Sequence, residues 1–533
     1  MSTQPEKKTD VEAAAAAAPD NLEPIDSIKA GLSESYEDKT NREFYGASVT
    51  DSYRLKSELV GRAMEEIGMG KYQWQIFVVT GWSQGLPTIQ PTVRLEFEDV
   101  TRVSLSSVAY YVGMIVGASF WGISADFIGR KPAFNATLLI GGVCACIVAG
   151  LSNFAGFCVL FFLIGTAAGG NVPVDSMIFL EFVPGSHQYL LTALSGWWNF
   201  GQVIVSLLGW VFIANFNCPA DATPETCSRS DNMGWRYIMI TLGGLALVFA
   251  ITRIFFFKMP ESPRYLLSKG RDAEAVEAVN FVARRNGQPE PLSLAMLVSI
   301  DISLGLPPNP HAEGRPGLSA LQRLKENLAD FHISNYKDLF ATRKLAQHTT
   351  IIWAIWLIIG VAYPLYFNFL PTYLAQRFTS ANSLDYTYRI YCITSAVGVL
   401  GPITASLLVR ERHLGRRYSM TVSAIVAGIF LMAYTRATSE AMNVAFNCVT
   451  SVLGNLFYAI MYSFTPESFP APLRGLATGQ AATLLRTGGL AASLIGTYTN
   501  FSVVPIYVSA AMWIAVGVMC VGLPFETQGR GAL

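Results

Sequence analysis

The stretch GISADFIGRK, residues 122–131, contains the motif that decides the fold. Its last three residues, GRK at 129–131, are matched by GRR at 415–417, a shift of 286 (415 − 129). A second motif, EFVP at 181–184, is matched by ESFP at 467–470, and 467 − 181 is again 286. Two unrelated motifs at a single offset indicate that the chain is built from two copies of one unit.

Each copy also contains six apolar stretches of the length that a membrane-crossing helix needs, roughly 20 residues. They lie at 72–93, 103–125, 133–152, 154–182, 189–214 and 236–258, and then at 347–370, 387–409, 418–435, 440–463, 476–498 and 501–523. The first stretch is the weakest, because polar residues and two prolines fill its second half. The sequence therefore predicts an all-α membrane protein with twelve transmembrane helices in two pseudo-symmetric six-helix bundles. Transporters of this architecture bind their solute between the halves, near the middle of the membrane.

Charged residues are scarce and unevenly placed. They make up 14% of the 533 residues, against roughly 25% in a soluble domain. The 38 basic residues balance the 38 acidic ones, which argues against a nucleic-acid partner. Residues 1–71 hold 23 charged residues, whereas 103–258 hold only 12. We expect a disordered tail (1–71), an N-terminal bundle (72–258), a central loop with short helices near 272–285 and 318–331 (259–346), a C-terminal bundle (347–523) and a short C-terminal tail (524–533).

The short loops predict the orientation, because Lys and Arg are retained on the cytoplasmic side of a membrane. Arg130 and Lys131 separate the second and third stretches, and four arginines separate the eighth and ninth. These loops, the central loop and both chain ends are therefore expected in the cytoplasm, with the plasma membrane as the default location. Cys218 and Cys227 share a polar loop, and the sequence leaves open whether they form a disulfide.

The motifs resemble those of the major facilitator superfamily. GISADFIGRK is similar to its loop motif after the second span, and PESPR at 260–264 and PESFP at 466–470 resemble the signature of sugar porters and organic-ion transporters. GGNVPVD at 169–175 is similar to the fourth span of a subgroup with synaptic-vesicle-glycoprotein-like proteins and niacin transporters. The chain most resembles fungal members of that subgroup, over about residues 64–525. The resemblance implies a transporter and not an enzyme.

The resemblance also implies a gate at the cytoplasmic helix ends. Asp126 and Arg130 would pair in one conformation and separate in the other, while the glutamates of the motifs would form salt bridges with arginines of the loops. The copies differ: Gln188 stands where symmetry would place a second Arg474, and in the second copy Glu411 is the possible substitute for Asp126. A simpler interpretation is that the basic residues only keep these loops on the cytoplasmic side and take no part in gating. The expected gating residues are Gly122, Asp126, Gly129, Arg130, Lys131, Glu181, Glu261, Arg264, Gly415, Arg416, Arg417, Glu467 and Arg474.

Asp175 and Arg486 lie deep inside the fourth and eleventh stretches. An ionisable side chain at such depth costs about 2.5–3.5 kcal/mol on insertion scales and is a functional candidate. The two could pair, or Asp175 could carry a proton while Arg486 attracts an anionic substrate; a structural ion pair is the simpler interpretation. Arg253 is expected to extend to the cytoplasmic surface. Amide and aromatic side chains on expected cavity-lining spans complete the set, although packing is the better explanation of each one taken alone: Asn171, Trp197, Trp198, Asn199, Gln202, Tyr363, Tyr366, Asn368, Asn447 and Asn455.

The sequence lacks the GxxxxGK[ST] loop of an ATP-driven pump, and its five histidines show no metal-ligand spacing. We expect a secondary transporter without cofactors that moves a small polar or anionic organic solute in symport with protons, as a monomer in the lipid bilayer. Two alternatives stay open. One is efflux of a metabolite or drug by the same fold. The other is a non-transporting nutrient sensor or trafficking protein, which the short first stretch and the long tail would suit.

Overall fold

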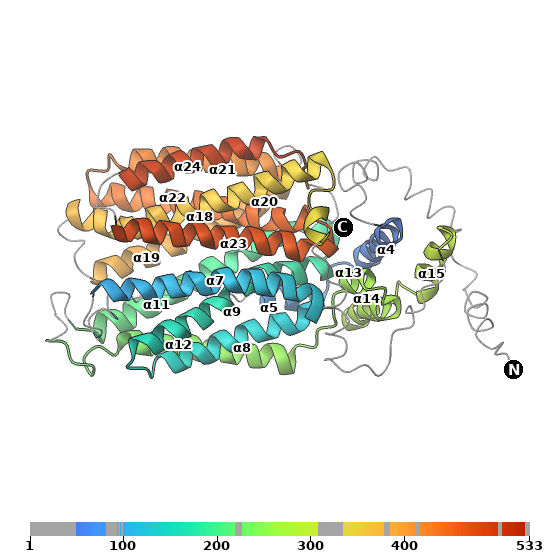
Figure 1. Cartoon of the computed structure of the whole chain (residues 1–533), viewed down its shortest axis with the longest axis horizontal. Helices are drawn as coiled ribbons and strands as arrows, with labels where there is room; N and C mark the ends of the chain where they lie inside the picture. The colour runs from blue at the N-terminus through green and yellow to red at the C-terminus, as the bar shows by residue number, and fades with distance from the viewer. Residues whose placement is uncertain are drawn as a thin grey trace.

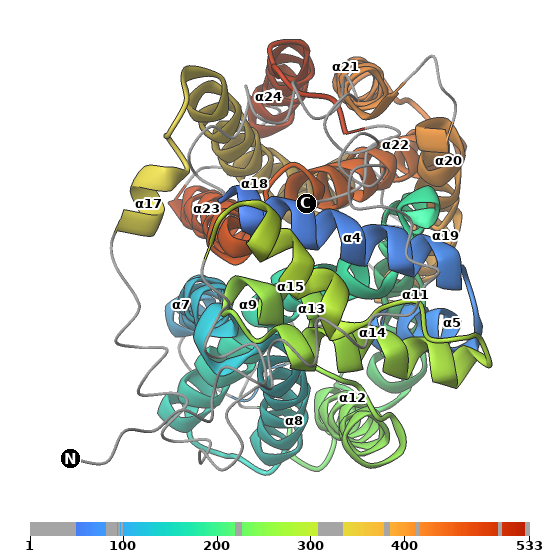
Figure 2. The same ribbon diagram turned by 90° about the vertical axis from the view of Figure 1, so that its right-hand side faces the viewer.

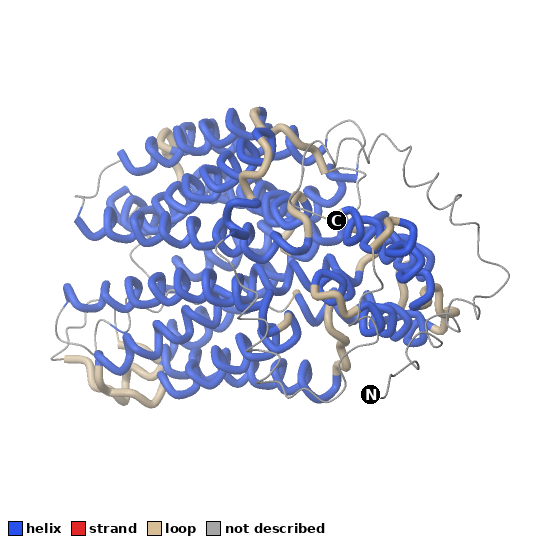
Figure 3. The backbone as a smooth tube through the Cα atoms, turned by 45° about the vertical axis from the view of Figure 1, so that its right-hand side comes forward, coloured by secondary structure: helices blue, strands red, loops and turns tan. Residues whose placement is uncertain are grey.

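The computed structural model describes residues 50–81, 93, 96, 100–218, 226–306, 334–377, 384–410, 415–498 and 504–527. All regular secondary structure in these ranges is helical (Figure 1, Figure 3). Most helices run side by side in one elongated bundle, and a smaller group lies across one end of it. That end carries the loops at 129–131 and 415–417, and we call it the motif end. The opposite end is called the disulfide end, because Cys218 and Cys227 form a disulfide there.

The first half of the bundle comprises α5 (Lys71–Thr80), α7 (Val100–Ile128), α8 (Arg130–Val148), α9 (Phe154–Phe182), α11 (Gly196–Asn215) and α12 (Gly234–Ile251). Two short helices, η2 (Gly185–His187) and α10 (Tyr189–Leu194), lead into α11, and α12 continues into a π-helical turn, η3 (Thr252–Phe256). Asn153 begins α9 by accepting a hydrogen bond from the backbone N–H of Ala155 at 3.0 Å, the usual role of an N-cap side chain.

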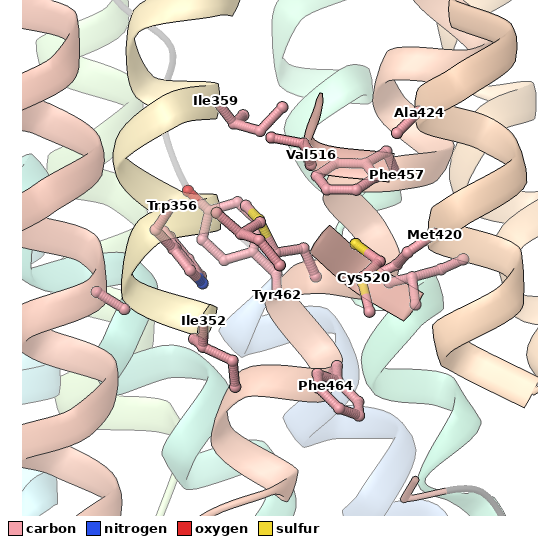
Figure 4. Packing of buried hydrophobic residues seen from close by; sticks show 14 of the residues in the cluster. Ile352, Trp356, Ile359, Met420, Ala424, Phe457, Tyr462, Phe464, Val516 and Cys520 are labelled. Atoms are coloured by element: carbon pink, nitrogen blue, oxygen red, sulfur yellow. The ribbon is translucent and has the colours of Figure 1, made fainter. Parts of the chain in front are cut away.

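The second half comprises α18 (Arg343–Arg377), α19 (Leu384–Gly398), α20 (Leu400–Arg410), α21 (Gly415–Tyr434), α22 (Glu440–Glu467), α23 (Ala471–Tyr498) and α24 (Val504–Val521). Helices α19 and α20 together occupy the predicted stretch 387–409. Buried side chains from α18, α22 and α24, among them Trp356, Phe457 and Val516, form the core of this half (Figure 4).

Ten helical segments in the described ranges are long and apolar enough to cross a membrane. Their outer faces expose apolar side chains such as Val159, Val248 and Val518, which a water-soluble protein would not gather on its surface. Two further helices, α5 with its ten residues and the more polar α23, lie in the same bundle at the places of the first and eleventh predicted spans (Figure 1). The two-bundle architecture predicted from the sequence is therefore confirmed.

The two halves meet where α7, α9 and α11 of the first half pack against α23, α22 and α19 of the second. Figure 2 looks at the motif end and shows the second half above the first. One contact between α7 and α23 is very close: a Cβ added to Gly122 would lie 2.8 Å from the Cα of Gly479. Small residues at both positions allow the two backbones to approach this closely.

The prediction of a disordered tail over residues 1–71 is wrong for residues 51–67, which form helix α4 (Asp51–Ile67). At the motif end α4 contacts α13 (Pro263–Ser268), α14 (Asp272–Asn286) and α15 (Leu294–Ser303) of the central loop (Figure 2). A last short helix, α17 (Ser334–Asp338), contacts α23. Helix α14 matches the helix expected at 272–285, whereas the one expected at 318–331 lies outside the described residues, as do residues 1–49 and 528–533.

Candidate functional site

Glu181, near the end of α9, is held between two arginines that belong to different halves. Its Oε1 lies 2.5 Å from Nη1 of Arg130, which begins α8 in the same half. The same oxygen lies 2.8 Å from Nη1 of Arg474 on α23 of the other half. All three side chains are at most 1% exposed, so solvent and salt screen these ion pairs very little. One carboxylate thus joins the two halves at the motif end.

The loop before α8 is shaped around a second carboxylate, Glu261. Gly129 has a φ of +97°, and a Cβ there would lie 2.6 Å from Glu261 Oε2, so this position requires glycine. Glu261 accepts hydrogen bonds from the backbone N–H groups of Arg130 (3.0 Å) and Lys131 (3.5 Å). Burial raises the pKa of Glu261 in spite of these donors. Glu261 therefore binds the start of α8 through the backbone, and the salt bridge expected for it does not form among the described residues.

The second half contains a matching cluster. Arg416 Nη2 lies 2.7 Å from Glu467 Oε2, just as Arg130 pairs with its own glutamate. Glu526 accepts hydrogen bonds from the backbone N–H groups of Arg416 (3.2 Å) and Arg417 (3.1 Å). It therefore takes the place that Glu261 has in the first half.

Glu526 and its neighbour Thr527 were missed in the sequence. The Thr527 hydroxyl donates to Glu467 Oε2 at 3.2 Å, while in the first half Arg130 Nη1 donates to the hydroxyl of Ser262 at 3.2 Å. A signal for both was present, because PFET at 524–527 repeats the proline, acid and hydroxyl of PES at 260–262. That repeat does not follow the offset of 286, since 526 − 261 is 265.

The ion pair between the halves has no symmetric counterpart in the described part of the chain. The offset of 286 places uncharged Gln188 where a second Arg474 would stand, and Glu467 pairs only within its own half. Further contacts between the two halves are hydrogen bonds between hydroxyl groups. Thr192 Oγ1 on α10 donates to Ser463 Oγ on α22 at 2.8 Å, and the hydroxyls of Ser119 on α7 and Thr483 on α23 lie 2.8 Å apart.

The other predicted gating residues have varied surroundings. Gly415 has a φ of +59° and, like Gly129, needs the freedom of glycine. Arg417 donates to the carbonyl of Val521 at 2.7 Å, and Lys131 is exposed. Arg264 is buried and forms no ion pair with any described residue. The side chain of Asp126 and the whole of Glu411 lie outside the described part of the structure.

Arg486, in the middle of α23, is a buried cation at the boundary between the halves. Its charge acts on Tyr110 and Tyr111 of α7 and on Tyr458 and Tyr462 of α22, so tyrosines of both halves lie within reach of its field. Nη1 donates to the carbonyl one turn earlier, at 3.4 Å, and its side chain is 8% exposed. No salt bridge to Arg486 forms within the described ranges.

Several predicted polar side chains line a pocket in the second half of the bundle. Tyr363 and Tyr366 of α18 line this pocket, and the Tyr366 hydroxyl donates to Asn447 Oδ1 at 2.5 Å. The rings of Tyr363 and Tyr458 meet edge to face, with centroids 5.4 Å apart. Tyr458, which does not line the pocket, also feels the charge of Arg486.

Of the remaining amide side chains predicted to line the cavity, some lie at the boundary between the two halves and others lie elsewhere. A Cβ added to Gly398 of α19 would lie 2.7 Å from Asn455 Nδ2 and 3.9 Å from Asn199 Oδ1, so these two amides from different halves share one location. Asn171 lines a separate cavity within the first half. Gln202 is exposed on α11 and forms no hydrogen bond with described residues. The side chain of Asn368 lies outside the described part.

Asp175 does not pair with Arg486, and its salt-bridge partner is Arg253, whose Nη1 lies 3.9 Å from Oδ1. The expectation that Arg253 extends to the surface is wrong. Its side chain is 2% exposed, stacks 3.8 Å from the ring centroid of Phe134 and donates to the carbonyl of Val79 at 2.6 Å. It lies in η3, a π-helical turn of a kind often found at functional sites. Both carboxylate oxygens of Asp175 are buried without a hydrogen-bond donor among the described residues.

Comparison with known proteins identifies the family. Residues 75–493 match the family model described as Major Facilitator Superfamily. The chain is 61% identical over 527 residues to the protein named major facilitator-type transporter hxnZ of Emericella nidulans, covering 96% of this chain and 94% of that one. The chain belongs to the major facilitator superfamily. This facilitator is also 41% identical over 493 residues to MFS siderochrome iron transporter 1 of Ceriporiopsis subvermispora, covering 90% of this chain and 92% of that one.

A solved structure of the proton:xylose symporter XylE, bound to 6-bromo-6-deoxy-D-glucose, has the same fold, with a TM-score of 0.62 and 15% identity over 90% of this chain and 97% of that one. The facilitator is therefore an integral, multi-pass membrane transporter and not an enzyme. In the present structure the Glu181–Arg474 ion pair and the Gly122–Gly479 contact join its halves at the motif end. The described residues thus hold this transporter closed at that end.

Proposed function

We propose that this facilitator is a secondary active transporter of a small polar or anionic organic solute and that it works as a proton symporter. The motif end faces the cytoplasm, because it carries the short basic loops, and the protein acts as a monomer in the plasma membrane. The two halves rock about the site between them, so that the site opens to one side of the membrane at a time.

Arg486 is the observation that carries the proposal. This arginine is buried and has no carboxylate partner among the described residues, so it presents a fixed charge and several donors to an anionic ligand. The tyrosines around it come from both halves, so its surroundings change when the halves move. A hydrogen bond to a charged group contributes about 1.5–3 kcal/mol, which is sufficient to select an anion over a neutral analogue.

The groups beside Arg486 favour a small organic solute with an aromatic or polar body. Aromatic side chains contact flat or apolar parts of a ligand, while their hydroxyls and nearby amides fix its orientation. Tyr363, Tyr366 and Asn447 supply such groups in the pocket of the second half. The resemblance to a subgroup that includes niacin transporters agrees with an aromatic carboxylate as one member of this class.

Asp175 supports the proton-coupling part of the proposal. Its carboxylate is buried in α9, and within the described ranges the 3.9 Å contact to Arg253 is the one ion pair that offsets its charge. Binding a proton would remove that buried charge, and losing it again would restore the attraction to Arg253. A carboxyl group in this situation can couple the proton gradient to a movement of the helices around it.

The test of the solute class uses two ligands that differ mainly in charge, nicotinate and its neutral amide. Binding to the purified protein is measured by titration calorimetry, with simple carboxylates, sugars and amino acids as further probes. We expect a carboxylate to bind at least about 10-fold more tightly than its amide, which corresponds to roughly 1.4 kcal/mol. Arg486→Gln should remove this preference, whereas Arg436→Gln, at an exposed residue of the same half, should keep it. Binding of neutral sugars alone, unaffected by Arg486→Gln, would refute the anionic part of the proposal.

A further inference from the structure

Helix α4 is fastened to the motif end by a buried lysine. Lys56 Nζ lies 2.6 Å from Asp272 Oδ2 at the start of α14 and 2.6 Å from Asp301 Oδ2 in α15, and all three side chains are at most 6% exposed. Ser52 adds a hydrogen bond from its hydroxyl to Asp301 Oδ1 at 2.6 Å. A single cation thus ties α4 to two helices of the central loop.

The apolar face of α4 completes this anchor. Val60, Ala63 and Met64 are buried in the same hydrophobic cluster as residues of α9, α13 and α14. At the C-terminal part of α4, Glu65 Oε2 accepts a hydrogen bond from the backbone N–H of Ser186, at 3.2 Å. Because α4 is also joined to α5 by only three residues, it is expected to move with the first half.

The N-terminal turn of α4 reaches the boundary between the halves. Tyr53 is buried there, close enough to Glu181 and Arg474 to interact with their charges. Its hydroxyl has no hydrogen-bond partner among the described residues, and burial raises its pKa to about 12. Figure 2 shows α4 lying across the end of the bundle where the two halves meet.

We propose that α4 is a part of the gate, in which the ring of Tyr53 covers the Glu181–Arg474 ion pair and Lys56 positions that ring. Covering the pair keeps water away, and an ion pair is stronger where the local dielectric constant is low. Arg474 leaves Glu181 when the motif end opens, so the distance between Tyr53 and Arg474 must increase in the same step. The proposal depends on the transporter fold and on no particular solute or coupling ion.

The test measures how fast a cysteine in the closed gate reacts with a reagent that approaches from the motif end. The reporter is Ser463→Cys, because Ser463 is fully buried and bonds across the halves to Thr192. The six free cysteines are replaced and the Cys218–Cys227 disulfide is kept. The full-length protein is labelled in vesicles of known orientation with a membrane-impermeant maleimide, and its melting temperature is recorded.

We expect Tyr53→Ala and Lys56→Met each to raise the labelling rate at least about threefold. Tyr53→Phe should label as slowly as the parent, since the ring and not the unpartnered hydroxyl covers the ion pair. Arg62→Met is the matched control on the same helix, because Arg62 is 49% exposed and its one ion-pair partner in the described part of the chain is Glu58, at 3.6 Å. Its labelling rate should equal that of the parent.

Two outcomes would overturn the proposal. One is a Tyr53→Ala protein that keeps the parent's melting temperature and also its slow labelling, which would show that the ring does not restrict opening. The other is fast labelling in Tyr53→Ala with slow labelling in Lys56→Met, which would leave Tyr53 in the gate but remove Lys56 from its positioning role. Tyr53→Ala retains the lysine anchor, so the first readout does not depend on whether Lys56→Met folds.

Discussion

At the motif end, one buried glutamate faces several buried arginines, so the positive charges outnumber the negative ones there. Among the described residues, Glu181 is the one carboxylate that pairs with both Arg130 and Arg474, and the charge of buried Arg264 also acts on it. Removing this carboxylate leaves several cations together in a buried place. Such an arrangement is far less stable than the intact pair, because buried charges without a partner are poorly solvated.

Glu181→Gln should therefore lower stability and open the gate, while the equivalent change in the second half should only lower stability. Breaking a buried ion pair costs roughly 3–5 kcal/mol, so we expect a lower melting temperature in both Glu181→Gln and Glu467→Gln. The two glutamates differ in their partners: Glu181 is bonded to Arg474 of the other half, whereas Glu467 is bonded to Arg416 of its own half. The labelling rate of Ser463→Cys should rise in Glu181→Gln and stay unchanged in Glu467→Gln; equal rates in the two variants would mean that the ion pair between the halves does not control closure.

Glycine substitutions at two positions should have opposite effects on stability. Gly129→Ala places a Cβ 2.6 Å from Glu261 Oε2 on a backbone with φ +97° and ψ 157°, and a conformation that essentially only glycine adopts costs another residue about 1–3 kcal/mol. Gly244→Ala adds a methyl group where no heavy atom lies within 4 Å, inside α12, and should stabilise the helix by about 0.5–1 kcal/mol. Thermal unfolding of the purified variants measures both. A Gly129→Ala protein as stable as the parent would show that the loop has another conformation.

At the scale of elements, contacts between distant segments explain what the sequence did not predict. Lys56 binds Asp272 and Asp301, which lie 216 and 245 residues further along the chain, so α4 looked like part of a polar tail. Arg253 was expected at the surface because its partners, Asp175 and the carbonyl of Val79, cannot be inferred from local sequence. In contrast, a repeat present in the sequence would have been sufficient to find Glu526.

The Asp175–Arg253 pair should behave as a coupled unit that connects α9, η3 and α5. Each single change, Asp175→Asn or Arg253→Met, leaves one buried group without its partner and should cost roughly 3–5 kcal/mol. The double variant removes both charges and should lose clearly less than the sum of the two. Denaturation of all four proteins completes the double-mutant cycle. Additive losses would indicate that the 3.9 Å contact is not an energetic interaction.

For the molecule as a whole, the internal repeat and the apolar stretches were sufficient to predict two six-helix bundles. Both features can be read from the sequence without knowing which residues meet in space. The repeat could not predict where the symmetry fails. The matching clusters around Glu181 and Glu467 are alike within each half, but only Glu181 reaches across, to Arg474. The repeat also could not predict the surroundings of Arg486, because the tyrosines near it come from both halves and are distant in the sequence.

Coupling of an anionic solute at Arg486 to a proton at Asp175 can be tested by measuring the pH outside liposomes that contain the purified protein while nicotinate or another carboxylate is added. We expect the outside to become more alkaline, Asp175→Asn to abolish this change but still exchange labelled solute, and Arg486→Gln to lose both activities. Solute uptake without any pH change, or a pH change that persists in Asp175→Asn, would show that transport is not coupled to a proton at Asp175.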